Sequence, residues 1–279
     1  MNVVFFHLGP QPYLEVAIRQ AAAFNKVILL GDESNSFLGD IDNVYHVNFN
    51  ELNSEVDRFT NNYIHLSNNS LNLEISSYVR WIYIRNLMRS TKMSICFHSD
   101  SDNLIYSDLE EPYKFLGSPN FALSVPYNQP EFRWSAAGTT SFWSLEVLEG
   151  FCEFLFSLYE DKDKFKNLLE TKWRHHQENN VAGGVCDMTA LWHFSQITPP
   201  DKILTKATDY HFTFDHNINT SENHFRDEYR LTNGLKDVTI KDGHPHSYNL
   251  ISNENIKFHT LHFQGQSKAL MSSFSTYHD

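Results

Sequence analysis

The chain of 279 residues is 41% hydrophobic and can bury a substantial core, while its formal net charge of −12 argues against nonspecific binding to nucleic acids or acidic membranes. Its three cysteines show no CxxC spacing, which argues against a disulfide framework or a structural zinc site and favours a reducing cytoplasm. No signal peptide or long apolar segment is found, so we expect no transmembrane segment, and surface contact with a membrane stays open.

The first predicted elements form a β-α-β unit. Apolar runs at 2–8 and 26–32 have the length of strands, and between them apolar residues recur at helical spacing. Continuous apolar strands are typical of a parallel sheet covered on both faces, so the sequence predicts an α/β fold. His7 and Asp32 follow these strands, at the edge where such sheets bind ligands. For Asp32, ordinary turn chemistry is an equally good explanation.

An aspartate pair follows the next helix and strand. Residues 74–90 predict a helix with Ser76 or Ser77 near its start, and a buried strand leads from it to Asp100 and Asp102. Two carboxylates spaced in this way at a strand end can share one hard divalent cation, whose charge compensates for their repulsion and desolvation. A solvated acidic turn is the alternative, and for this short pattern alone it is the more frequent one.

The middle of the chain gives weaker signals. The small residues at 135–141 predict a turn that leads into a helix with one apolar face. Asp187 follows a predicted Gly183-Gly184 bend and is placed to cap a helix. Residues 205–255 are polar and rich in turns, and we expect loops of this region to determine specificity.

Two segments of the sequence carry residues that suit a metal ion with a phosphate ligand. In "HFQGQSK", His262 can complete the coordination of a metal, Gly265 permits close approach of the backbone to a phosphate, and Lys268 offers it a charge. Arg80, in the predicted helix before the aspartate pair, can hold a diphosphate or a sugar hydroxyl. The alternatives are a structural histidine and a surface charge on a helix.

The order of these motifs resembles a known family. The stretches "SSYVRWIYIRNLM…KMSICFHSDSDNLIY", "GVCDMTAL" and "LHFQGQSK" are similar to the retaining, metal-dependent sugar-nucleotide glycosyltransferases of the glycogenin and bacterial lipopolysaccharide galactosyltransferase type. In that family a Tyr-x-Arg helix precedes an Asp-x-Asp strand, an Asp-Gln segment lies in mid-chain, and a His-x-x-Gly-x-x-Lys segment comes late. The matches are short but extend from about residue 75 to residue 268.

The resemblance implies a single Rossmann-like domain of the glycosyltransferase A type over residues 1–279, with a mainly parallel central sheet flanked by helices. Residues 1–110 would form the nucleotide-binding half, and residues 111–279 the acceptor half with the metal- and phosphate-binding segment. The implied activity is retaining transfer of a hexose from a UDP-sugar to a glycan or another hydroxyl acceptor, with Mn²⁺ or Mg²⁺. The implied setting is cytoplasmic polysaccharide biosynthesis in a bacterium.

The resemblance also assigns roles to single residues. Asp100, Asp102 and His262 become metal ligands, and Asp187 becomes the catalytic residue, on the sugar or acceptor side. The donor site is then formed by His7, Asp32, Arg80, Gly265 and Lys268.

Three departures from the family pattern leave alternatives open. Met188 and Thr189 stand where Gln and Asp are usual, Ala136 where an Asn that touches the sugar is typical, and Ala269-Leu270 where Pro-Trp is common. A non-catalytic nucleotide-sugar-binding protein is therefore the main alternative, and a metal-dependent sugar-nucleotide hydrolase is a weaker one.

Overall fold

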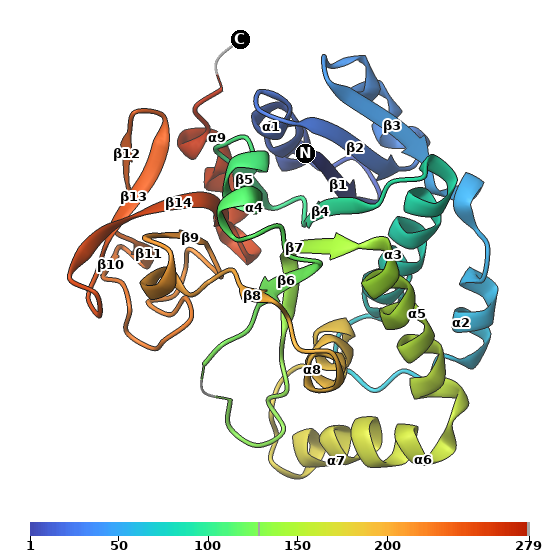
Figure 1. Ribbon diagram of the computed structural model, residues 1–279. Coiled ribbons are helices and arrows are strands. Elements are labelled where there is room, and N and C mark those ends of the chain that lie inside the picture. Colours follow the sequence, from blue (N-terminus) through green and yellow to red (C-terminus); the bar gives the residue numbers. More distant parts are fainter. Residues whose placement is uncertain (128, 278–279) are drawn as a thin grey trace.

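The computed structural model describes residues 1–127 and 129–277. Within these residues the strands form a seven-stranded sheet, here the main sheet, a five-stranded second sheet, and a two-stranded ribbon (Figure 1). The order of the main sheet is β3 (Val44–Asn48), β2 (Lys26–Gly31), β1 (Asn2–Phe6), β4 (Ile95–Ser99), β7 (Ala137–Ser144), β6 (Phe121–Ser124) and β8 (Lys202–Ile203). β7 is antiparallel to both of its neighbours, and the other pairs are parallel. The predicted mainly parallel α/β sheet is confirmed.

Alternate residues of the central strands pack into two different cores. In β1, Val4 belongs to the core on one face of the sheet, whereas Val3 and Phe5 belong to the core on the other. Both faces are buried, which explains why these strands are continuously apolar in the sequence. The first face is covered by α2 (Val56–Asn62), α3 (Leu71–Thr91), α5 (Leu145–Glu160) and α8 (Asp187–Ile197), and the second by α1 (Pro12–Ala22) and α4 (Glu110–Phe115).

Two further helices, α6 (Lys162–Lys164) and α7 (Thr171–Glu178), follow α5 and are joined by a π-helical stretch, Phe165–Glu170. They lie at the bottom of Figure 1, away from the second sheet. None of the helices in the described part of the chain combines the length and the apolar character that crossing a bilayer requires.

The second sheet, at the left of Figure 1, is formed mostly by the polar, turn-rich region and the residues that follow it. Its order is β12 (Thr239–Lys241), β13 (His244–Asn249), β14 (Glu254–His262) and β5 (Asn103–Ile105), with β9 (Phe212–Phe214) also paired to β14. The ribbon consists of β10 (Leu231–Thr232) and β11 (Leu235–Lys236), and the short helix α9 (Met271–Phe274) follows β14. Because β4 belongs to the main sheet and β5 to the second, residues 100–102 join the two sheets.

Two sequence-based expectations are corrected by the structure. Helix α3 begins at Leu71, earlier than Ser76 or Ser77, because the side chain of Ser70 accepts a hydrogen bond from the Leu73 N–H and caps the helix. Of the small residues at 135–141 predicted to form a turn, residues 137–141 instead belong to the buried strand β7. A Cβ on Gly138 would lie 2.5 Å from the Trp81 ring, so close packing inside the protein is the reason for a small residue there.

Candidate functional site

Asp100 and Asp102 lie in the turn that joins the two sheets. The Asn103 N–H donates to the Asp100 carbonyl oxygen at 3.2 Å and closes the turn. The Asn103 side chain donates to the carbonyl oxygens of Asp100 and Thr139, at 3.3 and 3.1 Å, and the Asp100 N–H also donates to Thr139, at 2.8 Å. Strand β7 therefore fixes the turn, and with it the positions of the two carboxylates.

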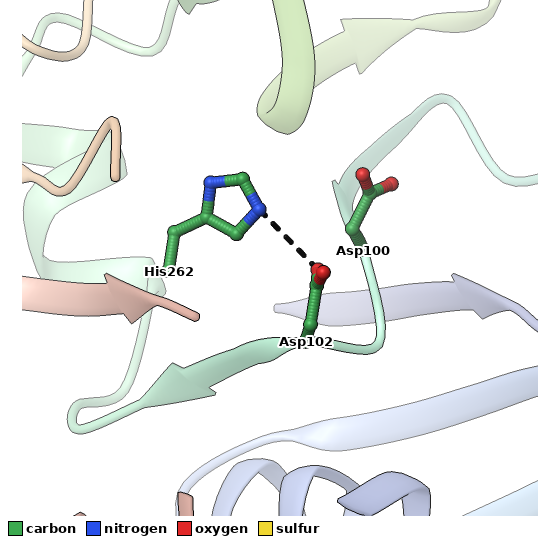
Figure 2. A group of neighbouring side chains, drawn as sticks. All are labelled: Asp100, Asp102 and His262. Carbon is green, nitrogen blue, oxygen red and sulfur yellow. Dashed lines mark ion pairs between the residues drawn. The ribbon is translucent and has the colours of Figure 1, made fainter. Parts of the chain in front are cut away.

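His262 is brought to the aspartates by the pairing of β14 with β5. In the register of this antiparallel pair His262 is opposite Asn103, and the next residue, Phe263, donates its N–H to the Asp102 carbonyl oxygen at 2.8 Å. His262 Nε2 is 3.3 Å from Asp102 Oδ1, and one ligand atom from each of Asp100, Asp102 and His262 lies within 4.8 Å of the others (Figure 2). Side chains distant in the sequence thus converge on one point.

The hydrogen bonding of the His262 ring fixes which nitrogen can bind a metal. Nδ1 is 2.6 Å from the carbonyl oxygen of His216. Because a carbonyl oxygen only accepts, Nδ1 carries a hydrogen and donates it. Nε2 then faces Asp102. A metal-ligating histidine usually donates the hydrogen of its other ring nitrogen to a protein group in this way.

Two cations from separate segments neutralise the aspartates. Arg80, on α3, bridges Asp100 and Asp187 at 2.5 Å each, and Lys268 Nζ lies 3.1 Å from Asp102 Oδ2. Burial disfavours the charged carboxylates, but Arg80 holds the pKa of Asp100 well below its usual range, and His262 and Lys268 lower the pKa of Asp102. Both carboxyl groups are therefore ionised at neutral pH.

A pocket of about 270 Å³ opens beside the aspartates. His7 is part of its wall, where the Nδ1 atom lies 2.7 Å from Ser101 Oγ. Burial, together with the charge of Lys268, lowers the pKa of His7 to about 4, so its ring is neutral at pH 7. The pocket is lined by Phe6, His7, Leu8, Tyr13, Leu73, Ser76, Ser77, Arg80, Asp100, Ser101, Asp102 and Lys268.

Part of this lining was missed in the sequence analysis. Leu73, Ser76 and Ser77 lie in the same wall as Arg80, and their spacing of three, four and seven residues places all four on one face of α3. Counting back from Arg80 at helical spacing would have found them. No comparable signal in the sequence identifies Tyr13. This residue lies on α1, and only the tertiary structure brings it to the pocket.

Four of the predicted site residues are not part of the pocket wall. His262 is 2% exposed and stands next to the wall residue Asp102. Gly265 has a φ of +60° and begins a short 3-10 helix, Gly265–Leu270, that carries Lys268. Asp32 accepts a hydrogen bond from the Ser34 N–H at 2.9 Å, as expected of a local turn, and a second from the distant Gly9 N–H at 2.8 Å.

Asp187 is the fourth predicted site residue outside the pocket wall, and it is 3% exposed. It is the first residue of α8, whose N-cap is Cys186, so the expected capping role is corrected. Its carboxylate instead accepts hydrogen bonds from Arg80 and, at 3.0 Å, from the indole N–H of Trp81. The catalytic role assigned to Asp187 stays a prediction.

The chemistry of the three converging side chains suits a divalent metal ion. Two carboxylates are ligands that Mg²⁺ and Mn²⁺ prefer, and an imidazole nitrogen suits the more borderline Mn²⁺. The Nε2 atom of His262, with Nδ1 tied to a carbonyl group, is oriented toward the same point as the carboxylates. Asp100, Asp102 and His262 therefore fit such an ion on the geometry of the chain alone.

Comparison with known proteins gives a result for the fold. No protein-family model and no curated protein sequence matches the chain. Among solved structures, the galactosyltransferase LgtC in complex with donor and acceptor sugar analogues matches 100% of this chain and 98% of its own, with 14% identity and a TM-score of 0.50. An active-site mutant of LgtC matches over the same shares, with 13% identity and a TM-score of 0.52. The chain thus has the glycosyltransferase A-type fold.

Proposed function

We propose that the protein is a metal-dependent glycosyltransferase that moves a hexose from a UDP-sugar to a hydroxyl group of a glycan or another acceptor. The observation that carries the proposal is the convergence of Asp100, Asp102 and His262 beside a pocket that also contains Arg80 and Lys268. The fold shared with LgtC, a galactosyltransferase whose structure holds donor and acceptor sugar analogues, supports it.

Each group has a role in this proposal. Asp100, Asp102 and His262 hold Mn²⁺ or Mg²⁺, and the bound ion supplies positive charge to the diphosphate that leaves. Lys268 moves from Asp102 to the diphosphate and adds a second positive charge. His7, neutral and at the pocket wall, contacts the nucleoside. In this proposal the donor side lies in residues 1–110, and residues 111–279 provide the acceptor side together with His262 and Lys268.

We further propose that configuration at the anomeric carbon is retained without a covalent enzyme intermediate. A double displacement needs a nucleophile that reaches the sugar, whereas Asp187 is buried, is not part of the pocket wall, and its Oδ2 atom accepts hydrogen bonds from both Arg80 and Trp81. The acceptor hydroxyl then attacks from the face of the leaving group. The bond from the anomeric carbon to the diphosphate oxygen breaks, a bond to the acceptor oxygen forms, and the hydroxyl proton passes to the departing phosphate.

The first test is a calorimetric titration of UDP into the protein with and without Mn²⁺. We expect binding that depends on Mn²⁺ and is lost in both Asp102→Asn and His262→Ala, because these residues lie on two segments that form one site. Asp163→Asn, at an exposed aspartate of α6, is the matched control and should bind like the unaltered protein. An affinity for UDP that changes neither with Mn²⁺ nor with either substitution would contradict the proposed site.

A second experiment separates transfer from hydrolysis. The protein is incubated with UDP-hexoses and Mn²⁺, with and without a mixture of sugar acceptors, and the products are separated by mass. Glycosylated acceptor supports the proposal, whereas release of free hexose alone favours a hydrolase. UDP-sugar binding without either product would indicate a non-catalytic protein.

A further inference from the structure

A buried ion pair lies next to the segment that carries His262. The side chains of Asp215 and Lys236 are both 0% exposed, and Lys236 Nζ is 2.5 Å from Asp215 Oδ1. Burying two charges in this way costs desolvation energy, and a pair of apolar residues in the same space is often equally stable. The pair therefore calls for an explanation other than stability.

Asp215 contacts His262 directly. Its Oδ2 atom accepts a hydrogen bond from the His262 backbone N–H at 3.1 Å, and its own N–H donates to Thr260 Oγ1 at 3.2 Å. The next residue, His216, provides the carbonyl oxygen that accepts the hydrogen of His262 Nδ1. Residues 215 and 216 thus fix both the main chain and the ring of His262.

Lys236 holds this segment in place from the ribbon. Its Nζ also donates to the Asn217 carbonyl oxygen at 2.6 Å, and its backbone N–H donates to the Ile218 carbonyl oxygen at 2.7 Å. Ile218 in turn donates its N–H to the His262 carbonyl oxygen at 2.9 Å. The charge of Lys236 is therefore satisfied by the same short segment that surrounds His262.

We propose that Asp215 and Lys236 are positioning residues for the metal-ligating nitrogen of His262. The proposal rests on the function proposed above, in which His262 binds the metal. Asp215 accepts a hydrogen bond from the His262 N–H, Lys236 holds the Asp215 carboxylate in its orientation, and the His216 carbonyl group sets the tautomer of the His262 ring. Outer groups of this kind determine how well a metal ligand is oriented, and their loss commonly weakens metal binding by about 10- to 100-fold.

The test compares two double variants by measuring the Kd for Mn²⁺ alone. Asp215→Leu with Lys236→Met and Asp215→Asn with Lys236→Met both remove the ion pair without leaving a buried charge. The Asn variant keeps an oxygen for the His262 N–H, and the Leu variant does not. We expect Mn²⁺ binding at least about tenfold weaker in the Leu variant, and an affinity in the Asn variant close to that of the unaltered protein.

A second comparison covers the case in which the Leu variant does not fold. In Asp215→Asn alone, the amide oxygen turns toward the buried ammonium group of Lys236, so the amide NH₂ faces the His262 N–H. Mn²⁺ binding should then weaken, and the added Lys236→Met substitution should restore it. Thermal unfolding of each variant shows that the protein is folded at the temperature of the titration.

The outcomes separate this proposal from the proposed function. Equal Mn²⁺ affinity in all folded variants, with Mn²⁺ binding by the unaltered protein, overturns the positioning role alone. Mn²⁺ binding that His262→Ala does not change overturns the ligand role of His262 and the positioning role with it. No Mn²⁺ binding by the unaltered protein overturns both proposals.

Discussion

In the proposed function, a metal ion would have to replace a proton on His262. Burial of the ring disfavours the charged form, but the carboxylate of Asp102 and the hydrogen bond to His216 raise the pKa of His262 to about 9. A metal ion binds only the unprotonated nitrogen. Below pH 9, binding of such an ion to His262 would therefore require loss of this proton.

We predict that Mn²⁺ binding releases about one proton per ion at pH 7.5, and that Mn²⁺ affinity rises with pH until about pH 9. The sign follows from competition between the proton and the ion for Nε2. As the pH rises toward 9, the fraction of molecules with a protonated Nε2 falls. Titration calorimetry in buffers of different ionisation enthalpy measures the release. His262→Ala should lose both effects, and an affinity independent of pH between 6 and 9 would contradict the prediction.

Asp187 is predicted to act through Arg80. In Asp187→Asn the amide oxygen can still accept from Trp81, but Arg80 loses one of its two carboxylate partners. A hydrogen bond to a charged group contributes about 1.5–3 kcal/mol, so we expect sugar transfer to slow by roughly 10- to 100-fold while remaining measurable. Steady-state rates with a UDP-sugar test this. Complete loss of transfer, with a covalent glycosyl adduct detected by mass spectrometry in the unaltered protein, would identify Asp187 as the nucleophile instead.

At this scale the sequence predicts which residues meet only where spacing carries the information. Asp100 and Asp102 are adjacent in any strand-end turn, and a late His-x-x-Gly-x-x-Lys segment was expected beside them. Asp32 and Asp187 show the limit, because each makes contacts that depend on a distant partner. Asp32 is bound by Gly9 and Asp187 by Arg80, and no pattern in the neighbouring sequence indicates either contact.

At the scale of elements, strand β7 shows how composition can mislead. Its small residues predicted a turn, yet the strand is buried between β4 and β6. Gly138 lies against Trp81, whose indole N–H holds Asp187. The close approach of strand and indole ring, and not chain reversal, requires the glycine.

Two glycine substitutions are predicted to have opposite effects on the free energy of unfolding. In Gly138→Ala the added Cβ lies 2.5 Å from Trp81, which should destabilise the protein by about 1–3 kcal/mol through overpacking. In Gly150→Ala, inside helix α5, the nearest atom lies 3.8 Å from the new Cβ, so the better helix former should stabilise by about 0.5–1 kcal/mol. Urea denaturation measures both, and a Gly138→Ala variant as stable as the unaltered protein would contradict the packing argument.

Elements with a strong period were predicted well and those without one were not. The first β-α-β unit and α3 have regular apolar spacing, and the structure contains them. The start of α3 was misplaced because Leu71 and Leu73 are exposed apolar residues that do not extend the buried stripe. The cap at Ser70 determines the boundary instead.

At the scale of the whole molecule, the predicted metal ligands come from both sheets. Asp100 and Asp102 lie in the link that follows β4 of the main sheet, and His262 is the last residue of β14 in the second sheet. An ion bound by all three would connect the two sheets at a point where three residues of chain now connect them. Binding should therefore restrain the ends of strands in both sheets.

We predict that Mn²⁺ with UDP slows amide hydrogen exchange at residues 100–103 and 260–263 together, because a ligand that binds the folded state alone suppresses local opening. Exchange followed by mass spectrometry with and without the ligands measures this. Residues 171–178 of α7, none of which lines the pocket, serve as the internal reference. Protection confined to one of the two segments would mean that the ion does not connect the sheets.

The α/β class and the mainly parallel sheet could be predicted because apolar strands alternate with helices in the first half of the chain. The second sheet could not, because most of its strands are short, polar or exposed; all three residues of β12, for example, are exposed. β14 finds its partner β5 across most of the sequence. Pairing over such distances leaves no local pattern to read.

The pairing of β5 with β14 also sets the time at which the site is completed during synthesis. The acidic turn is made early, yet His262 and Lys268 are added about 160 residues later, which at typical translation speeds is roughly ten to thirty seconds. Until then the turn has Arg80 as its cationic partner but neither His262 nor Lys268. A nascent chain stalled before residue 262 would therefore lack two groups of the candidate site, and the proposed activity would require the last part of the chain.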